Sequence, residues 1–208
     1  MQTQSPVLPK KIPKQARSRA MFEALIEATA RILRTEGAEA VSTNRVAQVA
    51  GVSVGSLYQY FPGRDALMYA VLERQERAQL AMLAEALEPP LDGPLPDLVR
   101  KVVAALLAFH RNDPELTRVI LEQRRRLISM RPLSELESAF TLVVQEALRA
   151  RQDELRDLPL EIAPFIIQRT VDALSFETVI RRPDLLDDPR FEQEVVQLIL
   201  RYVGVEET

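Results

Sequence analysis

The spacing of its prolines limits what this 208-residue chain can fold into more than any other feature of the sequence. Proline is poorly tolerated inside a helix, so long helices fit only in the intervals between the fourteen prolines. Those intervals carry apolar residues at helical spacing, and no convincing alternating run indicates a strand. We therefore expect an all-α chain of about nine helices. The expected helices cover, in chain order, about 17–36, 43–50, 54–61, 64–87, 97–111, 114–130, 133–154, 162–182 and 189–203.

Charge is distributed unevenly along the chain, although the net charge is only −3. Residues 1–65 hold nine Lys/Arg and five Asp/Glu, a balance of +4, while residues 66–208 hold eighteen and twenty-five, a balance of −7. Residues 1–14 combine three prolines with basic side chains, which is typical of a flexible basic arm. A basic head on an acidic body predicts a polyanionic partner that contacts the head alone, with random fluctuation as the alternative.

The composition argues against several classes of protein. The chain has no cysteine, which leaves no disulfide framework and no thiolate metal site or nucleophile. No apolar run approaches a membrane span, and the basic N-terminus has no apolar segment of the secretory type. We expect a cytoplasmic protein with no membrane partner, cofactor or metal. A single histidine and the lack of a Gly-rich phosphate loop also disfavour an enzyme.

Residues 47–57, AQVAGVSVGSL, have the spacing of a helix-turn-helix unit. The small side chain of Ala47 lets two helices cross closely, and Gly51 can adopt the positive φ that the turn needs. Leu57 fills the angle between the helices. Ser42 and Ser53 are expected to cap the two helices.

On a helical wheel, Leu57 and Phe61 point inward from the second helix, and the outer face is formed by Gly55, Ser56 and Gln59. Tyr58 and Tyr60 flank this face. A face of small and amide side chains between two phenols suits the major groove of DNA, because glutamine can pair with an adenine edge and hydroxyls can bind phosphate. Glycine in the first turn would let the backbone approach DNA closely. The alternative is that the tyrosines are packing residues and that the glycine only relieves a helix crossing.

The stretch STNRVAQVAGVSVGSLYQYFPGRDAL at residues 42–67 resembles the DNA-binding signature of the TetR family of bacterial transcriptional regulators. The resemblance covers about residues 17–72 and implies an N-terminal three-helix DNA-binding domain at 15–63. It also implies a C-terminal helical domain for ligand binding and dimerisation at 64–208. The positions that it implies face DNA are Ser42, Thr43, Asn44, Ser53, Val54, Gly55, Ser56, Tyr58, Gln59, Tyr60 and Arg64. Arg64 stands where the family usually has lysine, so the charge is kept and the geometry of a phosphate contact changes.

The resemblance further implies a homodimer held by the last two helices. Residues 162–180, IAPFIIQRTVDALSFETVI, support this because a helix that is apolar around most of its circumference needs burial on several sides. The expected interface residues are Ile162, Phe165, Ile166, Ala173, Phe176, Ile180, Phe191, Val195, Leu198, Ile199 and Tyr202. The alternative is that both apolar stripes fill the core of a single chain.

A ligand cavity is implied among the fourth to eighth helices, and nothing in the sequence identifies the ligand. The candidate pocket residues are Leu106, Phe109, His110, Arg124, Phe140, Phe165 and Phe176. The aromatic residues could instead be plain core, His110 could be a solvated residue at a helix end, and Arg124 could belong to a solvated face.

The function predicted from the sequence is a repressor that leaves a palindromic, double-stranded operator when a small-molecule effector binds. A ligand-independent architectural or activating DNA-binding protein on the same scaffold is the second hypothesis. An all-α enzyme is the third. The sequence identifies neither the effector nor the operator.

Overall fold

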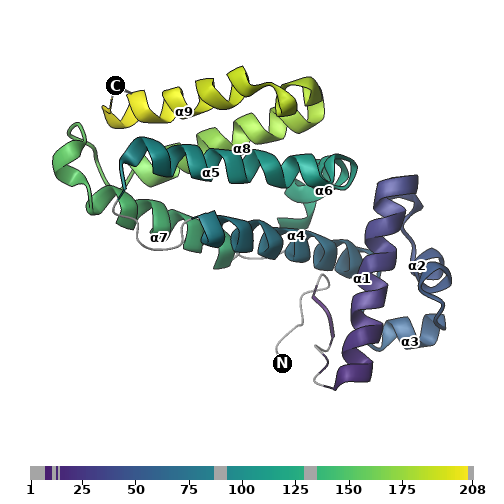
Figure 1. Cartoon of the computed structure of the whole chain (residues 1–208). Helices are drawn as coiled ribbons and strands as arrows, with labels where there is room; N and C mark the ends of the chain where they lie inside the picture. The colour runs from purple at the N-terminus through teal and green to yellow at the C-terminus, as the bar shows by residue number, and fades with distance from the viewer. Residues whose placement is uncertain (1–7, 11–12, 14, 87–92, 129–134, 206–208) are drawn as a thin grey trace. The chain divides into compact units, whose positions relative to one another are not determined.

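The computed structural model describes residues 8–10, 13, 15–86, 93–128 and 135–205, and every regular element in these ranges is helical (Figure 1). The all-α prediction is thus confirmed. The α-helices are α1 Ala16–Glu36, α2 Thr43–Ala50, α3 Val54–Tyr58, α4 Arg64–Ala86, α5 Leu95–Asn112, α6 Pro114–Ile128, α7 Glu135–Arg149, α8 Ala163–Arg181 and α9 Pro189–Val203. Three short 3₁₀ helices are η1 Ala38–Ala40, η2 Gln152–Glu154 and η3 Pro183–Asp187.

Three helix ends within the described ranges differ from the prediction by two residues or more. α5 begins at Leu95 rather than at 97, because proline at position 96 is tolerated in a first helical turn, where its missing N–H costs nothing. α3 ends at Tyr58 instead of 61, and α7 ends at Arg149 instead of 154. The end of α3 decides which side chains its outer face presents.

The described residues group into two compact units, the first formed by 1–76 and 115–133. Its core contains the buried side of α1, where Leu25, Ile32 and Leu33 are fully buried. It also contains all of residues 66–72 from α4, together with four residues of α6: Leu116, Val119, Ile120 and Leu127. A segment that is apolar on every side, like 66–72, must be covered all round. This requirement explains why α6 belongs to the same core as α1 and the first part of α4. The unit therefore extends beyond the 15–63 expected for the DNA-binding domain.

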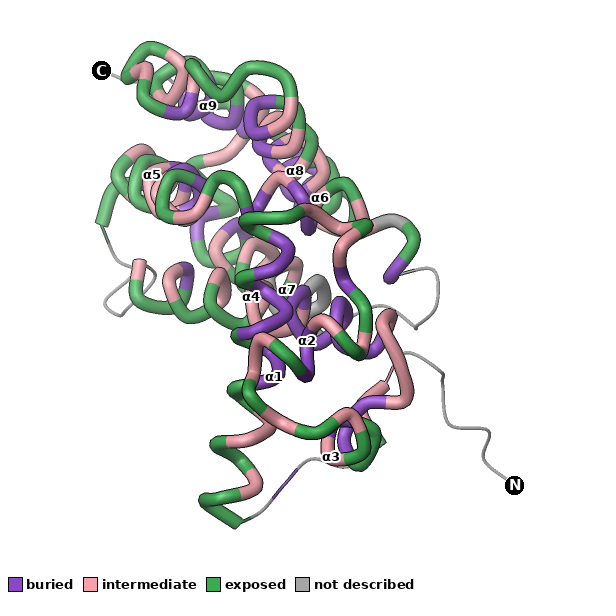
Figure 2. Tube along the Cα trace, turned by 90° about the vertical axis from the view of Figure 1, so that its right-hand side faces the viewer, coloured by how far each residue is buried: buried purple, intermediate pink, exposed green. Residues whose placement is uncertain are grey.

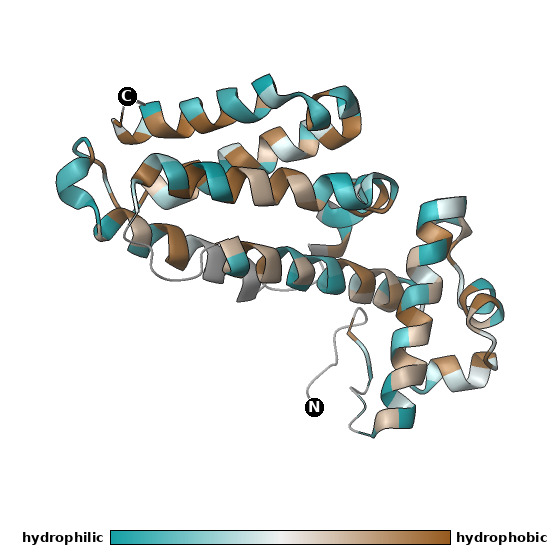
Figure 3. Ribbon diagram, in the orientation of Figure 1, coloured by the Kyte–Doolittle hydropathy of each residue, from teal (hydrophilic) through white to brown (hydrophobic). Residues whose placement is uncertain are grey.

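The second unit, residues 77–114 and 134–208, is a bundle in which α5 lies along α9 and α8 lies along α7 (Figure 1). α9 buries Val195, Ile199 and Val203 at helical spacing, and its opposite side is hydrophilic (Figure 3). The chain closes the helix at Gly204, whose φ of 84° is a left-handed conformation that favours glycine.

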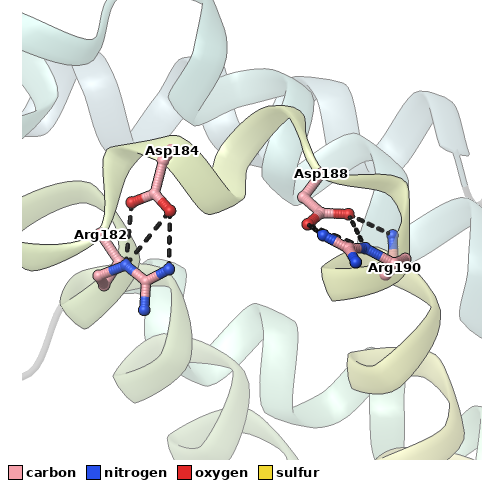
Figure 4. Close-up of polar contacts among 4 residues, drawn as sticks. All are labelled: Arg182, Asp184, Asp188 and Arg190. Atoms are coloured by element: carbon pink, nitrogen blue, oxygen red, sulfur yellow. Dashed lines mark hydrogen bonds and ion pairs between the residues drawn. The ribbon is translucent and has the colours of Figure 1, made fainter.

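Two arginine–aspartate pairs lie around η3, between α8 and α9 (Figure 4). Asp188 caps α9 by accepting a hydrogen bond from the Arg190 backbone N–H at 2.9 Å, and its carboxylate also accepts from the Arg190 guanidinium. These bonds favour the ionised carboxylate and lower the pKa of Asp188 to about 2. Arg182 binds Asp184 in the same forked manner.

Candidate nucleic-acid interface

The turn between α2 and α3 has the geometry that the sequence predicts. Gly51 adopts a φ of 68°, and its N–H donates to the carbonyl oxygens of the last turn of α2. Ala47 is 1% exposed where the helices cross, and Leu57 is fully buried between them. The helix-turn-helix corner is therefore built from a small residue, a left-handed glycine and an apolar plug.

Both expected caps are present. The Ser42 hydroxyl accepts the backbone N–H of Arg45 at 3.2 Å, and the Ser53 hydroxyl accepts the N–H of Ser56 at 3.0 Å. These bonds satisfy N–H groups that have no partner within a helix, so each helix starts at a defined residue.

On the outer side of α3 Gly55 is exposed and Ser56 is half-buried, and Gln59, the C-cap of the helix, is exposed. Figure 2 shows exposed and buried stretches next to one another around α3. A Cβ added at Gly55 would meet only the Ser53 hydroxyl oxygen, at 3.8 Å, so no neighbour among the described residues requires a glycine there. Val54 is half-buried against the core, which removes part of its surface from that face.

Tyr58 connects the end of α3 to the start of α2. Its hydroxyl lies 3.3 Å from the hydroxyl of Thr43, and its side chain is 41% exposed. Ser42 and Asn44 are exposed beside Thr43. Hydroxyl donors from two helices therefore converge on one exposed place, which is the arrangement that binds a phosphate oxygen well.

Tyr60 departs from the expected arrangement, because it is 9% exposed and belongs to the core. Its ring packs edge-on against Phe22, with the centroids 6.1 Å apart. The wheel assumed a regular helix through residue 61, but α3 ends at Tyr58 and the Tyr60 N–H already bonds to the Leu57 carbonyl in a tighter turn. This turn rotates Tyr60 inward and leaves Tyr58 as the exposed phenol.

Arg64 is held by the connection between α1 and α2. Its Nη2 donates to the Ala38 carbonyl oxygen at 2.8 Å and lies 3.8 Å from the Glu39 carboxylate. The arginine thereby ties the start of α4 to η1, and its contact with phosphate stays a prediction.

Part of the N-terminal arm contacts the end of α3. Lys10 donates its backbone N–H to the Tyr60 carbonyl at 2.7 Å and its Nζ to the Tyr58 carbonyl at 3.1 Å. Leu8 packs on the core and Pro13 is buried. Sequence reasoning missed this contact, and the only signal for it was apolar residues within a basic segment.

The second unit contains an apolar cavity of about 70 Å³ that is partly open to solvent. Its wall is entirely aliphatic and comes from α5, α7, α8 and α9: Leu95, Leu98, Val99, Val102, Val103, Val143, Val144, Ala147, Leu148, Ile167, Val171, Ile199 and Val203. Of the predicted pocket residues, the structure describes the side chains of Leu106, Phe109, His110, Arg124, Phe165 and Phe176, and none of them lines this cavity. The Phe140 side chain lies outside the described part. The role of these residues in a ligand pocket stays a prediction, and this cavity is lined by aliphatic side chains alone.

His110 is only 6% exposed, and its Nδ1 has no hydrogen-bond partner among the described residues. Burial penalises the charged imidazolium and lowers the pKa of His110 to about 4. The expectation of a solvated histidine at the helix end is therefore wrong, since desolvation outweighs the attraction of the helix C-terminus.

Apolar side chains are exposed along α8 and on α9. Ile162 is 52%, Phe165 59% and Ile166 37% exposed, and Leu198 on α9 is 49% exposed. Ala173 is exposed too, while Phe176, Ile180, Phe191 and Tyr202 are half-buried. Two predicted interface residues, Val195 and Ile199, are buried within their own unit, because they lie on the inner side of α9.

No group of metal-ligating side chains and no helix with the length and hydropathy of a membrane span occurs in the described ranges.

Comparison with known families gives two matches along the chain. The model described as "Bacterial regulatory proteins, tetR family" matches residues 25–71. A second, described as "Tetracyclin repressor-like, C-terminal domain", matches residues 94–202, which is just over half of the chain.

Similar sequences include nucleoid occlusion factors named SlmA. The protein from Vibrio campbellii is 31% identical over 99 residues, which is 47% of this chain and 50% of that protein. The one from Haemophilus ducreyi is 31% identical over 114 residues, or 54% of this chain and 53% of that protein. The chain thus matches about half the length of these relatives.

Similar solved structures cover nearly the whole chain at low identity. The fatty acid degradation regulator FadR from Bacillus halodurans has a TM-score of 0.69 at 18% identity and covers 94% of this chain and 100% of its own. A TetR-family transcriptional regulator from Haemophilus influenzae has a TM-score of 0.63 at 20% identity, covering 90% and 98%. These likenesses establish the fold.

Proposed function

This chain belongs to the tetR family of bacterial regulatory proteins, and we propose that it is a homodimeric repressor that leaves its operator when a small apolar ligand binds. Membership makes it a DNA-binding transcriptional regulator rather than an enzyme. The observation that carries the proposal is the outer side of α3 and its C-cap: Gly55 and Gln59 are exposed, and a Cβ at Gly55 would meet only the Ser53 hydroxyl oxygen.

In the proposed complex, base contacts come from α3 and its C-cap, and a phosphate contact joins the end of α3 to the start of α2. Gln59 can pair bidentately with an adenine edge in the major groove, and Ser56 can accept or donate to several bases. Thr43 and Tyr58, with hydroxyls 3.3 Å apart, bind one phosphate oxygen and fix the register of α3 in the groove.

Dimerisation is proposed through the exposed apolar stripe of α8. Residues 162, 166, 169, 173, 176 and 180 recur at alternating intervals of four and three, the spacing with which one helix packs along another, and all of them except Arg169 are apolar. Large apolar side chains such as Phe165 and Ile162 are half exposed or more, which is typical of an interaction surface. An isologous contact of this kind also gives the two-fold symmetry that a palindromic operator requires.

The ligand is proposed to occupy the aliphatic cavity, which offers no polar group to a guest. Apolar cavities stay dry and accept apolar molecules, so the ligand, or the part of it that enters, is a hydrocarbon group. α4 contributes residues to both compact units. A ligand that binds one conformation of the dimer more tightly than another shifts the population of dimers that can bind DNA.

A second candidate function is a nucleoid-associated DNA-binding protein that needs no ligand. The similarity to nucleoid occlusion factors favours it, and it matches the ligand-independent alternative on the same scaffold. The two functions differ in the number of binding sites per chromosome and in the response to apolar compounds.

The deciding experiment measures binding of the purified protein to its own upstream DNA and to random duplex. We expect operator preference, and we expect Gln59→Ala to relax it at one or two base pairs. Gln193→Ala, an exposed glutamine on α9, is the matched control and should change nothing. Equal affinity for operator and random duplex would overturn the proposal.

A thermal-shift series with short alkanes and alcohols then separates the two candidates. A ligand that fills the cavity raises the melting temperature and lowers operator affinity. No shift with any apolar compound, combined with many chromosomal sites, would favour the nucleoid-associated function.

A further inference from the structure

The first 22 residues carry five basic side chains and no acidic one. The structure describes three of the five: Lys10, Arg17 and Arg19. All three are exposed, and Arg17 and Arg19 lie in the first turn of α1.

Both ends of the segment from Lys10 to Phe22 contact residues at, or just after, the C-terminal end of α3. At one end, Lys10 donates to the carbonyl oxygens of Tyr58 and Tyr60. At the other end, the Phe22 ring stacks on Phe61, with the ring centroids 4.8 Å apart.

These contacts place the start of α1 beside the end of α3. At a rise of about 1.5 Å per residue, Arg19 lies roughly 4.5 Å and Arg17 roughly 7.5 Å along the helix axis from Phe22. The three cations therefore lie near the C-terminal end of α3, where Gln59 is the C-cap.

Arg17 and Arg19 have no acidic partner among the described residues, unlike other arginines of the same unit. Arg45 pairs with Glu36 at 2.7 Å, Arg74 pairs with Glu27 at 2.9 Å, and Arg126 pairs with Asp65 at 2.7 Å. In those pairs a carboxylate of the protein already lies beside the guanidinium. The guanidinium groups of Arg17 and Arg19 have no such carboxylate beside them among the described residues and can bind an anion from outside the protein.

Lys10 also keeps donor capacity. Its ammonium has three N–H donors, and one of them is used by the Tyr58 carbonyl. The backbone bond to Tyr60 holds the residue in place independently of its side chain.

We propose that Lys10, Arg17 and Arg19 form a second DNA-contact surface that binds phosphates flanking the base pairs read by α3. The proposal rests on the proposed function, since it assumes that α3 occupies a major groove. Lys10 also positions the surface by fastening the segment to the end of α3. Phosphate contacts of this kind add affinity that is independent of base sequence and sensitive to salt.

The test compares the salt dependence of operator binding for the protein and the double variant Arg17→Gln/Arg19→Gln. Each phosphate contact contributes roughly 0.9 to the slope of log K against log salt concentration, so the slope should fall by about two per bound protomer. The ratio of operator to random-duplex affinity should stay unchanged. Lys10→Met, which keeps the backbone bond to Tyr60, should lower the slope by about one.

Lys101→Gln/Arg201→Gln is the matched control, because both residues are exposed cations of the second unit and the charge lost is the same. Its slope should equal that of the unchanged protein. The proposal would be overturned if the slope of log K against log salt concentration were unchanged in Arg17→Gln/Arg19→Gln. It would also be overturned if the slope fell equally in both double variants. In either case a retained effect of Gln59→Ala would leave the proposed function standing, whereas absence of operator preference in the unchanged protein would remove it.

Discussion

At the scale of single residues, Gly55 separates the requirements of folding from those of DNA binding. A Cβ fits there with only an ordinary contact at 3.8 Å, and alanine is the better helix former by about 0.5–1 kcal/mol. We expect Gly55→Ala to leave the free energy of unfolding unchanged or to raise it by up to about that amount, while operator affinity falls. Chemical denaturation and operator titration measure the two effects. Lower stability with unchanged affinity would mean that the glycine serves packing.

His110 predicts a pH dependence of stability. Its pKa is about 4 in the folded chain against 6.5 for an exposed histidine, so the folded state resists protonation. The stability is complete above about pH 6.5 and is lost as the pH falls from there towards 4, by on the order of 3 kcal/mol.

Denaturation at pH 7 and at pH 4.5 measures this loss. His110→Leu should reduce it, because leucine has no proton to bind and Nδ1 has no described partner to lose. An equal loss in the variant would assign the pH dependence to other groups.

In the helix-turn-helix, the sequence predicts the places of the residues that build the turn better than those of the residues on the outer face. Gly51, Ala47 and Leu57 occupy their expected places, because sterics leave each position few alternatives. Tyr60 does not, because its direction depends on where α3 ends, and a wheel assumes that the helix continues. The contact of Lys10 with α3 could not be predicted, since it joins residues 48 positions apart through backbone atoms.

At the scale of elements, the end of α9 is closely packed around Gly204. A Cβ at this position would lie 2.7 Å from the Arg156 Cβ and 3.0 Å from its backbone nitrogen, in a left-handed conformation that already disfavours alanine. The Arg156 N–H donates to the Val203 carbonyl at 3.0 Å, so the neighbour cannot move without breaking that bond.

We expect Gly204→Ala to lower the free energy of unfolding by more than about 1 kcal/mol, from left-handed strain and overpacking together. Gly93→Ala is the matched control, since a Cβ there meets nothing within 4 Å. Urea denaturation of both variants measures the difference, and equal stabilities would contradict the packing described around Arg156.

The spacing of the prolines predicts where the helices lie in the sequence, but it does not predict which helices pack against one another. It predicts α6 at about the right residues, yet gives no hint that α6 packs with the first half of α4. That partnership follows from the apolar circumference of residues 66–72, which is a property of two elements together.

At the scale of the whole molecule, the exposed stripe of α8 predicts a dimer. Ile162→Ser/Phe165→Ser removes two large apolar side chains that make little contact within the chain, so each protomer should still fold. The variant should be monomeric at concentrations where the unchanged protein is dimeric, and its operator affinity should fall by at least tenfold, equivalent to about 1.4 kcal/mol.

Sedimentation gives the mass of the particle, and circular dichroism checks that it folds. Leu142→Ser is the control, because this residue of α7 is equally exposed, at 58%, and lies outside the stripe. Dissociation by Leu142→Ser and not by the α8 variant would place the interface elsewhere.

The independence of the outer side of α3 from the core also affects how such a protein can diversify. Gly55 and Gln59 are exposed, while α3 is anchored in the core by the fully buried Leu57, with Val54 partly buried beside it. Substitutions on that side alter which base pairs are recognised without passing through an unstable intermediate. A gene copy can therefore acquire a new target sequence in single mutational steps, with its scaffold unchanged.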